Sequence, residues 1–262
     1  MSTDTPAPLL FTRDAGIARL RINRPQQLNT IDSTLAQAFV AACREIAADR
    51  LVRVVVISGE GRGFGAGGDL AAMKTGGEAA ATELIGPMHE AVKILVALDA
   101  PVIASLHGVV AGGSMSLAMA CDLAIAADTT KFNLAYVNIG TSSDLSSSWH
   151  LPRVVGLRKA LEIAMLSETI DAAEGLRLGL VNRVVPSDRL VEETEALARK
   201  LATGPTLALG RMKRLMRASL QNDLATQLDL ESSEFRASTR THDFNEALAA
   251  FFDKRKPLFE GR

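Results

Sequence analysis

Residues 100–126 have the sequence APVIASLHGVVAGGSMSLAMACDLAIA, which carries almost no charge. The run over 102–106 predicts a buried strand, and the Gly112-Gly113 pair predicts a tight turn that opens into an apolar helix. A further strand is expected over 121–127. Residues 100–121 are enough to cross a membrane by length alone, but Pro101 and the glycine pair interrupt them, so we expect no transmembrane helix. Strand and helix alternating at this spacing predict an α/β fold.

The same alternation continues on both sides of this stretch. The expected elements are strands at 9–14, 17–24, 52–58 and 181–185, and helices at 33–49, 78–98, 156–167 and 171–179. Asp171 and Glu174 form a capping-box pattern at the start of the last of these helices. From Asp188 onward the strand signals disappear, and helix follows helix to about residue 254. We therefore expect an αβ core over 1–200 and a packed helical region over 201–262.

The composition excludes several classes of function. The formal net charge of the 262 residues is −1, from 29 basic and 30 acidic residues, which argues against nucleic-acid binding through a basic surface. Only 4% of the residues are aromatic, so base-stacking platforms are not expected. Two cysteines cannot form a disulfide framework, and the N-terminal MSTDTPAPLL lacks the features of a signal peptide. We therefore expect a cytoplasmic protein.

Two glycine-rich turns carry the first functional signal. FGAGGDL at 64–70 and VVAGGSMSL at 109–117 each follow an expected buried strand and precede an expected helix. The first belongs to a formal G-x-G-x-x-G pattern, but its helix is interrupted at 75–77, so dinucleotide binding is not expected. Glycine turns that open helices direct free amides toward one point, and two such amides can form an oxyanion hole. The alternative for either turn alone is a tight turn that needs positive φ.

Six segments resemble the crotonase superfamily, also called the enoyl-CoA hydratase/isomerase family. They cover nearly the whole chain in order and are INRPQQLNTID (22–32), GRGFGAGGDL (61–70), the stretch at 100–126, LPRVVGLRKALEIAML (151–166), DAAEGLRLGLVNRVVP (171–186) and AFFDKRKPLFEGR (250–262). The resemblance implies a crotonase-like spiral of ββα units, and a C-terminal helical region that assembles a homotrimer or a dimer of trimers. It also implies an acyl-CoA substrate, no metal, and no cofactor beyond the coenzyme A of the substrate.

The resemblance also assigns binding roles to individual residues. The two oxyanion amides of the family fall on Gly68 and Gly113. The adenine and phosphate end of coenzyme A is expected beside the first glycine turn and the loop before it, at Arg24, Gln26, Leu28, Ala66, Asp69 and Leu70. Phe252 and Lys254 are expected to help hold coenzyme A, from the same subunit or a neighbouring one. For Arg24 and Lys254 the alternative is a solvated surface charge.

The catalytic positions depart from those of enoyl-CoA hydratases. Family hydratases add water with two glutamates, and the corresponding positions here are Ser116 and Tyr136. Neither side chain is a carboxylate base, so efficient hydration is not expected. Asp144 lies where family isomerases carry the acid of G-x-x-P-[DE]-G-G, although this chain has GTSSDLS at 140–146. The alternative for Asp144 is an N-cap of a helix over 145–151.

Two reactions use these residues in different ways. In the favoured one, Asp144 removes an α-proton from a 3-enoyl-CoA, the Gly68 and Gly113 amides stabilise the enolate, and Asp144 returns the proton two carbons along. The second resembles the reaction of chlorobenzoyl-CoA dehalogenases. There Asp144 would attack an aryl ring stacked on Tyr136, and His89 would activate water to hydrolyse the resulting ester. For His89 the alternative is a structural helix histidine.

A third interpretation is a protein that binds coenzyme A esters without turnover. A related hypothesis is RNA binding by the helix after Pro205, which carries Arg211, Lys213, Arg214 and Arg217. Four basic residues on one helix are more often solvated or part of an oligomer contact, and the neutral net charge favours that alternative.

Overall fold

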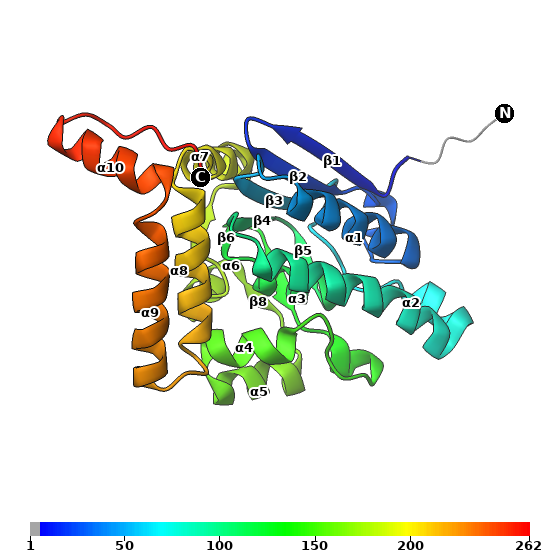
Figure 1. The fold of residues 1–262 in the computed structure, drawn as a ribbon. Coiled ribbons are helices and arrows are strands. Elements are labelled where there is room, and N and C mark those ends of the chain that lie inside the picture. The colour runs from blue at the N-terminus through cyan, green and yellow to red at the C-terminus, as the bar shows by residue number, and fades with distance from the viewer. Residues whose placement is uncertain (1–5) are drawn as a thin grey trace.

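The computed structural model describes residues 6–262, which form two β-sheets flanked by helices (Figure 1). Residues 1–5, half of the N-terminal decapeptide considered above, lie outside the described part. The larger sheet has the strand order β1-β2-β3-β4-β6-β9. Its strands are β1 (Leu9–Asp14), β2 (Ile17–Ile22), β3 (Val54–Gly59), β4 (Val102–Leu106), β6 (Leu123–Ala127) and β9 (Arg183–Val185). Strands β1 and β2 are antiparallel, and the other neighbours are parallel.

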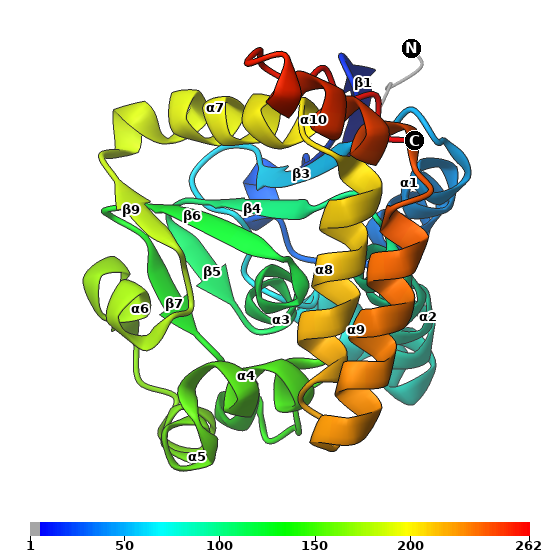
Figure 2. The same ribbon diagram turned by 60° about the vertical axis from the view of Figure 1, so that its left-hand side comes forward.

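A smaller sheet stands beside the larger one (Figure 2). It contains β5 (Val109–Ala111), β7 (Lys131–Asn133) and β8 (Ile170–Asp171), in the order β5-β7-β8. The sequence predicted only a loop at 109–111, which is wrong because β5 pairs in parallel with β7. Both strands have three residues, too few for a period-two pattern to stand out. Their pairing fixes the path of the chain just before Gly113.

Helices cover both faces of the larger sheet. Helices α1 (Ser33–Ala48) and α2 (Leu70–Ala97) pack on one face, and α7 (Leu190–Ala202) packs on the other. Alternate residues of β3 divide between these two cores, because successive side chains of a strand point to opposite faces. Val55 and Ile57 belong to the α1 and α2 side, whereas Val54 packs with residues of α7.

The first two helices begin at aspartate caps. The carboxylate of Asp32 accepts the Leu35 amide at 2.8 Å at the start of α1, and Asp69 accepts the Ala71 and Ala72 amides at the start of α2. Helix α2 contains a kink at Gly77, where φ is 55° and ψ is −135°. The expected interruption at 75–77 is therefore a kink at Gly77, whose non-helical backbone separates two helical segments of α2.

Four shorter helices surround the smaller sheet. They are α3 (Gly113–Ala120), α4 (Ser147–Val155), α5 (Leu157–Leu166) and α6 (Ala172–Leu178). Asp171 caps α6 by accepting the Glu174 amide at 2.9 Å, and α6 ends at left-handed Gly179, so these predicted end signals are confirmed.

Three helices at the C-terminus stand to one side of the sheets (Figures 1 and 2). They are α8 (Thr206–Ala218), α9 (Leu224–Ser238) and α10 (His242–Phe252). The four basic residues of α8 singled out above make ion pairs within the chain. Lys213 and Arg217 bind Asp122, Arg214 binds Asp99, and Arg211 binds Glu234. These pairs account for the basic helix without an RNA ligand.

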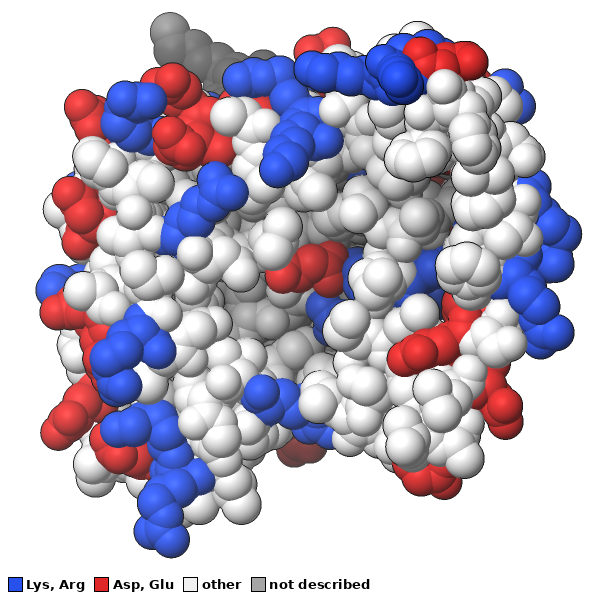
Figure 3. Space-filling view, turned by 90° about the vertical axis from the view of Figure 1, so that its left-hand side faces the viewer, with Lys and Arg blue, Asp and Glu red and all other residues white. Residues whose placement is uncertain are grey.

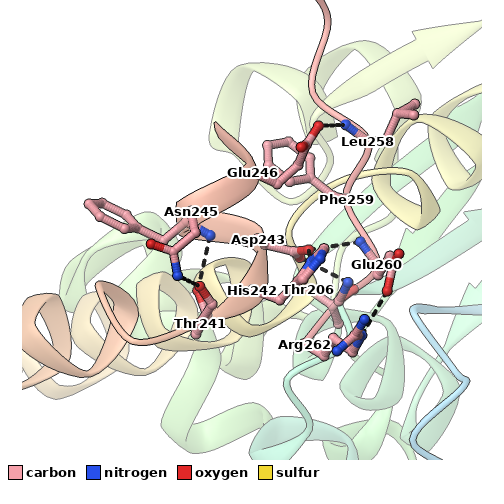
Figure 4. Close-up of polar contacts among 12 residues, drawn as sticks. Thr206, Thr241, His242, Asp243, Asn245, Glu246, Leu258, Phe259, Glu260 and Arg262 are labelled. Carbon is pink, nitrogen blue, oxygen red and sulfur yellow. Dashed lines mark hydrogen bonds and ion pairs between the residues drawn. The ribbon is translucent and has the colours of Figure 1, made fainter. Parts of the chain in front are cut away.

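The chain after α10 turns back and is held by the start of that helix (Figure 4). The carboxylate of Asp243 is buried and accepts the amides of Glu260 and Gly261 at 2.7 and 2.8 Å. The Asp243 amide in turn donates to the carbonyl of Arg262 at 3.0 Å. Glu246, one helical turn later, accepts the Leu258 amide at 2.8 Å. The last five residues are thereby anchored.

Two features are absent from residues 6–262. No helix in this range is long and apolar enough to cross a membrane. No cluster of three or more His, Cys, Asp or Glu side chains in the same range is placed to hold a metal ion.

Candidate active site

The two glycine turns lie against each other. Gly65 and Val110 form a parallel β-bridge, and the Gly67 amide donates to the Ser114 hydroxyl at 3.2 Å. A Cβ added to Gly65 would lie 2.3 Å from the Ser114 Oγ, so only glycine fits there. Gly67 has φ +98°, in the left-handed region that glycine adopts without strain. The sequence therefore places glycine where the turns make their closest approach.

The amides of Gly68 and Gly113 are unused within residues 6–262. Ile31 donates to the Gly67 carbonyl and accepts from the Asp69 amide, which leaves the Gly68 amide between them without an acceptor there. Gly113 is the first residue of α3, where an amide has no acceptor within the helix. The structure thus offers two free donors from adjoining turns, as an oxyanion hole requires.

The Asp144 carboxylate lies beside one of these glycines. A Cβ built on Gly113 would be 3.7 Å from Asp144 Oδ1, and 3.8 and 3.9 Å from methyl groups of Ile31 and Leu145. The position that a side chain on Gly113 would occupy is therefore bounded by one carboxylate oxygen and two apolar side chains. Met73 of α2 borders the other glycine, because its terminal methyl would lie 2.7 Å from a Cβ on Gly68.

Tyr136 joins Asp144 to Ser116. Tyr136 lies in a short 3-10 helix, η2 (Tyr136–Ile139), and its hydroxyl donates to Asp144 Oδ1 and lies 2.9 Å from Ser116 Oγ on α3. Burial raises the pKa of the Asp144 carboxyl above its usual range, while the Tyr136 hydrogen bond and nearby His89 act in the opposite direction. Burial and then the Asp144 charge raise the pKa of Tyr136, so this phenol stays protonated and remains a donor.

Asp144 is not a helix cap, so that alternative is wrong. Helix α4 begins at Ser147, its N-cap is Ser146, and no side chain caps it. Leu145 and Ser146 have φ values of 47° and 71°, so two consecutive non-glycine residues are left-handed. This turn carries the Asp144 side chain away from the helix start and toward Tyr136.

His89 also reaches this turn. It lies on α2, and its Nε2 accepts the backbone amide of Leu145 at 3.2 Å. The lone pair of that nitrogen is therefore engaged, and the contact fixes the backbone one residue after Asp144. The structure brings His89, Tyr136 and Asp144 to one turn, through atom contacts that the sequence did not indicate, and their catalytic roles stay a prediction.

The residues expected around coenzyme A form two groups. One group joins the first glycine turn to the loop before it, because the Ala66 amide donates to the Leu28 carbonyl at 3.0 Å. Gln26, two residues before Leu28, and Leu70, four residues after Ala66, are both exposed to solvent. The Arg24 guanidinium already binds two carboxylates, Asp32 at 2.8 Å and Asp69 at 3.3 Å. Arg24 is therefore an ion-paired, largely buried side chain rather than a solvated charge.

The second group lies at the C-terminus. Phe252 ends α10 with 76% of its side chain exposed, and Lys254 is exposed just beyond it. Figures 1 and 2 both show α10 apart from α2, whose first turn follows the glycine loop. Within one chain the structure does not bring these two residues to Gly68, so a contact with coenzyme A stays a prediction.

Sequence reasoning missed several residues of this region. Ile31 and Met73 border the free amides, and His150 contacts the Asp144 turn through Ser146. Single apolar residues give no sequence signal of their own. The contact of His150 with Ser146 depends on the left-handed turn at 145–146. The sequence GTSSDLS did not predict this turn, because it has no glycine after Asp144.

The chain is similar over nearly its whole length to proteins of one family. The family model of enoyl-CoA hydratase/isomerase matches residues 12–262. The 1,2-epoxyphenylacetyl-CoA isomerase of Escherichia coli (strain K12) is 34% identical over 253 residues, which cover 95% of this chain and 97% of that protein. The crotonyl-CoA hydratase of Syntrophomonas wolfei subsp. wolfei (strain DSM 2245B / Goettingen) is 30% identical over 252 residues, covering 96% and 97% of the two chains.

Solved structures share the fold. The enoyl-CoA hydratase from Bacillus anthracis superposes with a TM-score of 0.93 at 28% identity, over 97% of this chain and 100% of that one. The relatives include both hydratases and isomerases, so their names alone do not select a reaction. The two free glycine amides, the spiral fold and these matches lead to one conclusion: the chain belongs to the enoyl-CoA hydratase/isomerase family, the crotonase superfamily, whose enzymes act on acyl-CoA esters.

Proposed function

We propose that the enzyme moves a double bond in an enoyl-CoA, converting a 3-enoyl-CoA to a 2-enoyl-CoA. The observation that carries the proposal is the single carboxylate of Asp144, 3.7 Å from the Cβ position of Gly113. One carboxylate beside an oxyanion hole is sufficient for a reaction in which the same base removes and returns a proton.

The proposed steps conserve atoms and charge. Asp144 takes the C2 proton, and the electron pair of that C–H bond moves into the thioester, whose oxygen becomes negative. The Gly68 and Gly113 amides stabilise this enolate oxygen, and each such donor is typically worth about 10²–10³ in rate. Protonated Asp144 then delivers the proton to C4 as the double bond forms between C2 and C3.

The surroundings of Asp144 support both its removal of the proton and its return of the proton. Burial raises the pKa of the Asp144 carboxyl, which makes its anion a stronger base, and the Tyr136 hydroxyl keeps the group ionised before substrate binds. Tyr136 donates to Oδ1, the same oxygen that lies 3.7 Å from the Gly113 Cβ position, and we therefore assign proton transfer to the other oxygen of this carboxylate, Oδ2.

Hydration is disfavoured by the same contacts. Ser116 and Tyr136 occupy the positions of the two hydratase glutamates and bond to each other at 2.9 Å. A buried phenol with a raised pKa does not activate water as a general base. We expect turnover of 2-enoyl-CoA by added water to be at least an order of magnitude slower than isomerisation, since one general base commonly contributes about 10²–10⁴.

The test compares Asp144→Asn with Gly113→Ala on 3-enoyl-, 2-enoyl- and aroyl-CoA esters. Asp144→Asn should lower kcat for double-bond migration by about 10²–10⁴ and leave the Kd for a CoA ester nearly unchanged. Gly113→Ala should fold normally, because no atom lies within 3.7 Å of the added Cβ, and it should also lower turnover by filling the substrate space. Undiminished isomerisation by Asp144→Asn would contradict the proposal.

A dehalogenase-like reaction is the second candidate, because Tyr136 and His89 both contact the Asp144 turn. That reaction needs a free histidine nitrogen to activate water, whereas His89 Nε2 accepts the Leu145 amide. Chloride release from a chlorinated aroyl-CoA, lost in His89→Gln, would favour this reaction over isomerisation.

We further propose that the helical region over 201–262 is an assembly region. The large apolar side chains exposed on it are Met212, Met216, Leu220, Leu224, Leu228, Phe235, Leu248, Phe251, Phe252 and Leu258. Figure 3 views the molecule from this side, and much of the surface in view belongs to neither acidic nor basic residues. Such an uncharged face is typical of a subunit interface, and it would allow Phe252 and Lys254 to reach coenzyme A bound by a neighbouring copy.

A further inference from the structure

A second histidine contacts the turn that carries Asp144. His150 lies on α4 with 7% of its surface exposed. Its Nδ1 is 2.9 Å from Ser146 Oγ and 3.2 Å from the Ser146 carbonyl, and its Nε2 is 3.2 Å from Arg217 Nη1. No step proposed above uses this buried group.

These partners assign the proton on the ring. A guanidinium only donates, so His150 Nε2 accepts from Arg217 and the proton must lie on Nδ1. Nδ1 then donates to Ser146. Burial, followed by the Arg217 charge, lowers the pKa of His150 to about 4, so the ring stays neutral and keeps this tautomer near neutral pH.

The backbone at this point is strained without outside support. Leu145 and Ser146 are adjacent non-glycine residues in the left-handed region, which is unfavourable unless surrounding contacts hold them there. His89 accepts the Leu145 amide from one side, and His150 donates to Ser146 from the other. Each left-handed residue therefore has its own histidine contact.

The far end of the His150 contact is firmly anchored. Arg217 extends from α8 and donates to Asp122 Oδ1 at 2.9 Å and to the Ala120 carbonyl at 3.2 Å. Asp122 also accepts from Lys213 at 2.7 Å, through a lysine side chain that is 7% exposed. His150 thus joins a buried ion-pair cluster on the C-terminal helices to the backbone two residues after Asp144.

We propose that His150 is a positioning residue for Asp144. Resting on the proposed function, it holds the Leu145–Ser146 turn so that the carboxylate meets Tyr136 and lies beside Gly113, and Arg217 couples this geometry to α8. The charged or titratable groups facing His150 are Arg217 from α8, Arg153 of its own helix, and Asp122. Those facing Asp144 are Tyr136 from η2 and His89 from α2.

The test uses two substitutions of His150. His150→Phe preserves ring volume but removes both hydrogen bonds, so the turn should relax and Asp144 should lose the Tyr136 donor. We expect kcat to fall about tenfold to a hundredfold with KM for the CoA ester within about twofold, because small misplacements of a catalytic group cost this much. The acid limb of the kcat/KM profile should move to higher pH. His150→Asn, which retains a donor near the Nδ1 position, should recover most of kcat.

A matched control separates positioning from stability. Ile46→Val removes one methyl from the buried face of α1, so it should lower Tm modestly without touching the turn. If His150→Phe behaves like this control, with a lower Tm but unchanged kcat and pH profile below Tm, the proposal is overturned. Should His150→Phe fail to fold, Arg217→Lys provides the second variant, because it keeps the charge but loses the geometry to Nε2, and the same shift of the acid limb is expected.

A readout independent of turnover distinguishes the two proposals. The Asp144 carboxyl can be titrated by ¹³C NMR, with its resonance assigned by its absence in Asp144→Asn. A higher Asp144 pKa in His150→Phe supports the positioning role even if Asp144→Asn keeps isomerase activity, which would overturn the proposed function alone. An unchanged Asp144 pKa together with unchanged kcat overturns the positioning role alone.

Discussion

Two opposing influences act on the pKa of the Asp144 carboxyl. Burial favours the neutral acid, and the Tyr136 hydroxyl favours the carboxylate. The position of Asp144 could be predicted from the isomerase-like motif. The Tyr136 contact could not, because it depends on a left-handed turn that the sequence GTSSDLS, without the family's proline and glycines, gave no reason to expect.

Removing the Tyr136 hydroxyl tests this balance. In Tyr136→Phe the opposing hydrogen bond is gone, so the Asp144 pKa should rise further and the acid limb of kcat/KM should shift to higher pH. Hydrogen bonds to charged groups contribute about 1.5–3 kcal/mol, so we expect about a tenfold to hundredfold loss of kcat/KM below the new limb and a smaller loss well above it. A profile identical to that of the unaltered enzyme would show that the hydroxyl does not influence the base.

The same burial has a consequence for stability. The folded-state pKa of Asp144 is raised above its unfolded value, so at neutral pH the folded protein bears the cost of a buried carboxylate. This cost disappears as the pH falls through the raised pKa. Asp144→Asn should therefore raise Tm at pH 7, by about 2–4 °C for each kcal/mol recovered, and the difference should shrink on acidification. Calorimetry at several pH values measures it, and a lower Tm for the variant at pH 7 would contradict this sign.

At the scale of elements, the sequence predicted long and periodic segments well. The helix expected over 33–49 is confirmed as α1, whose buried face includes Leu35, Phe39, Cys43 and Ile46 at helical spacing. The glycine turns were also predicted, since glycine marks positions that no other residue can occupy. Strands β5 and β7 were not predicted. Each has only three residues, too few for an alternating hydrophobic pattern, and the two strands pair with each other.

Arg24 links two helix starts, and its removal should destabilise the protein. Its guanidinium binds both Asp32 and Asp69, the caps of α1 and α2, and only 16% of its side chain is exposed. Arg24→Ala leaves these carboxylates facing each other, so we expect a loss of about 1–3 kcal/mol in the free energy of unfolding.

Denaturant unfolding measures the effect of Arg24→Ala. The matched control is Arg21→Ala, whose ion pair with Glu60 is half exposed and should matter by less than about 1 kcal/mol. Equal stabilities for the two variants would contradict the structural role of Arg24. A larger effect on CoA affinity than on stability would instead favour the phosphate contact expected from the family.

At the scale of the whole molecule, the spiral core and the C-terminal helices were predicted from the loss of strand signals after Asp188 and from the family resemblance. The direction in which the helices project could not be predicted. It depends on long-range ion pairs such as Arg214 with Asp99 and Lys213 with Asp122, which join residues more than 90 positions apart.

Assembly through the C-terminal helices has a direct test. Phe235 on α9 and Met216 on α8 are 68% and 63% exposed and line one groove between these helices. The unaltered protein should sediment as three or six copies of the 27.9 kDa chain, and Phe235→Glu combined with Met216→Glu should sediment as single chains. The control is Leu51→Glu, at a residue that is 79% exposed before β3, and it should keep the assembled mass. Sedimentation of the unaltered protein as a single chain at micromolar concentration would contradict the assembly.

The hydrogen bonds between Asp243 and the backbone of residues 260–262, here called the C-terminal clasp, also matter for the design of fusion proteins. Asp243 holds the backbone of the last three residues, so the chain ends at a fixed point rather than at a loose end. An affinity tag or fluorescent fusion joined after Arg262 would start inside this clasp and emerge beside α10, where it would crowd the surface proposed for assembly. A C-terminal fusion that yields only single chains would therefore report on the tag, and its removal should precede any measurement of mass.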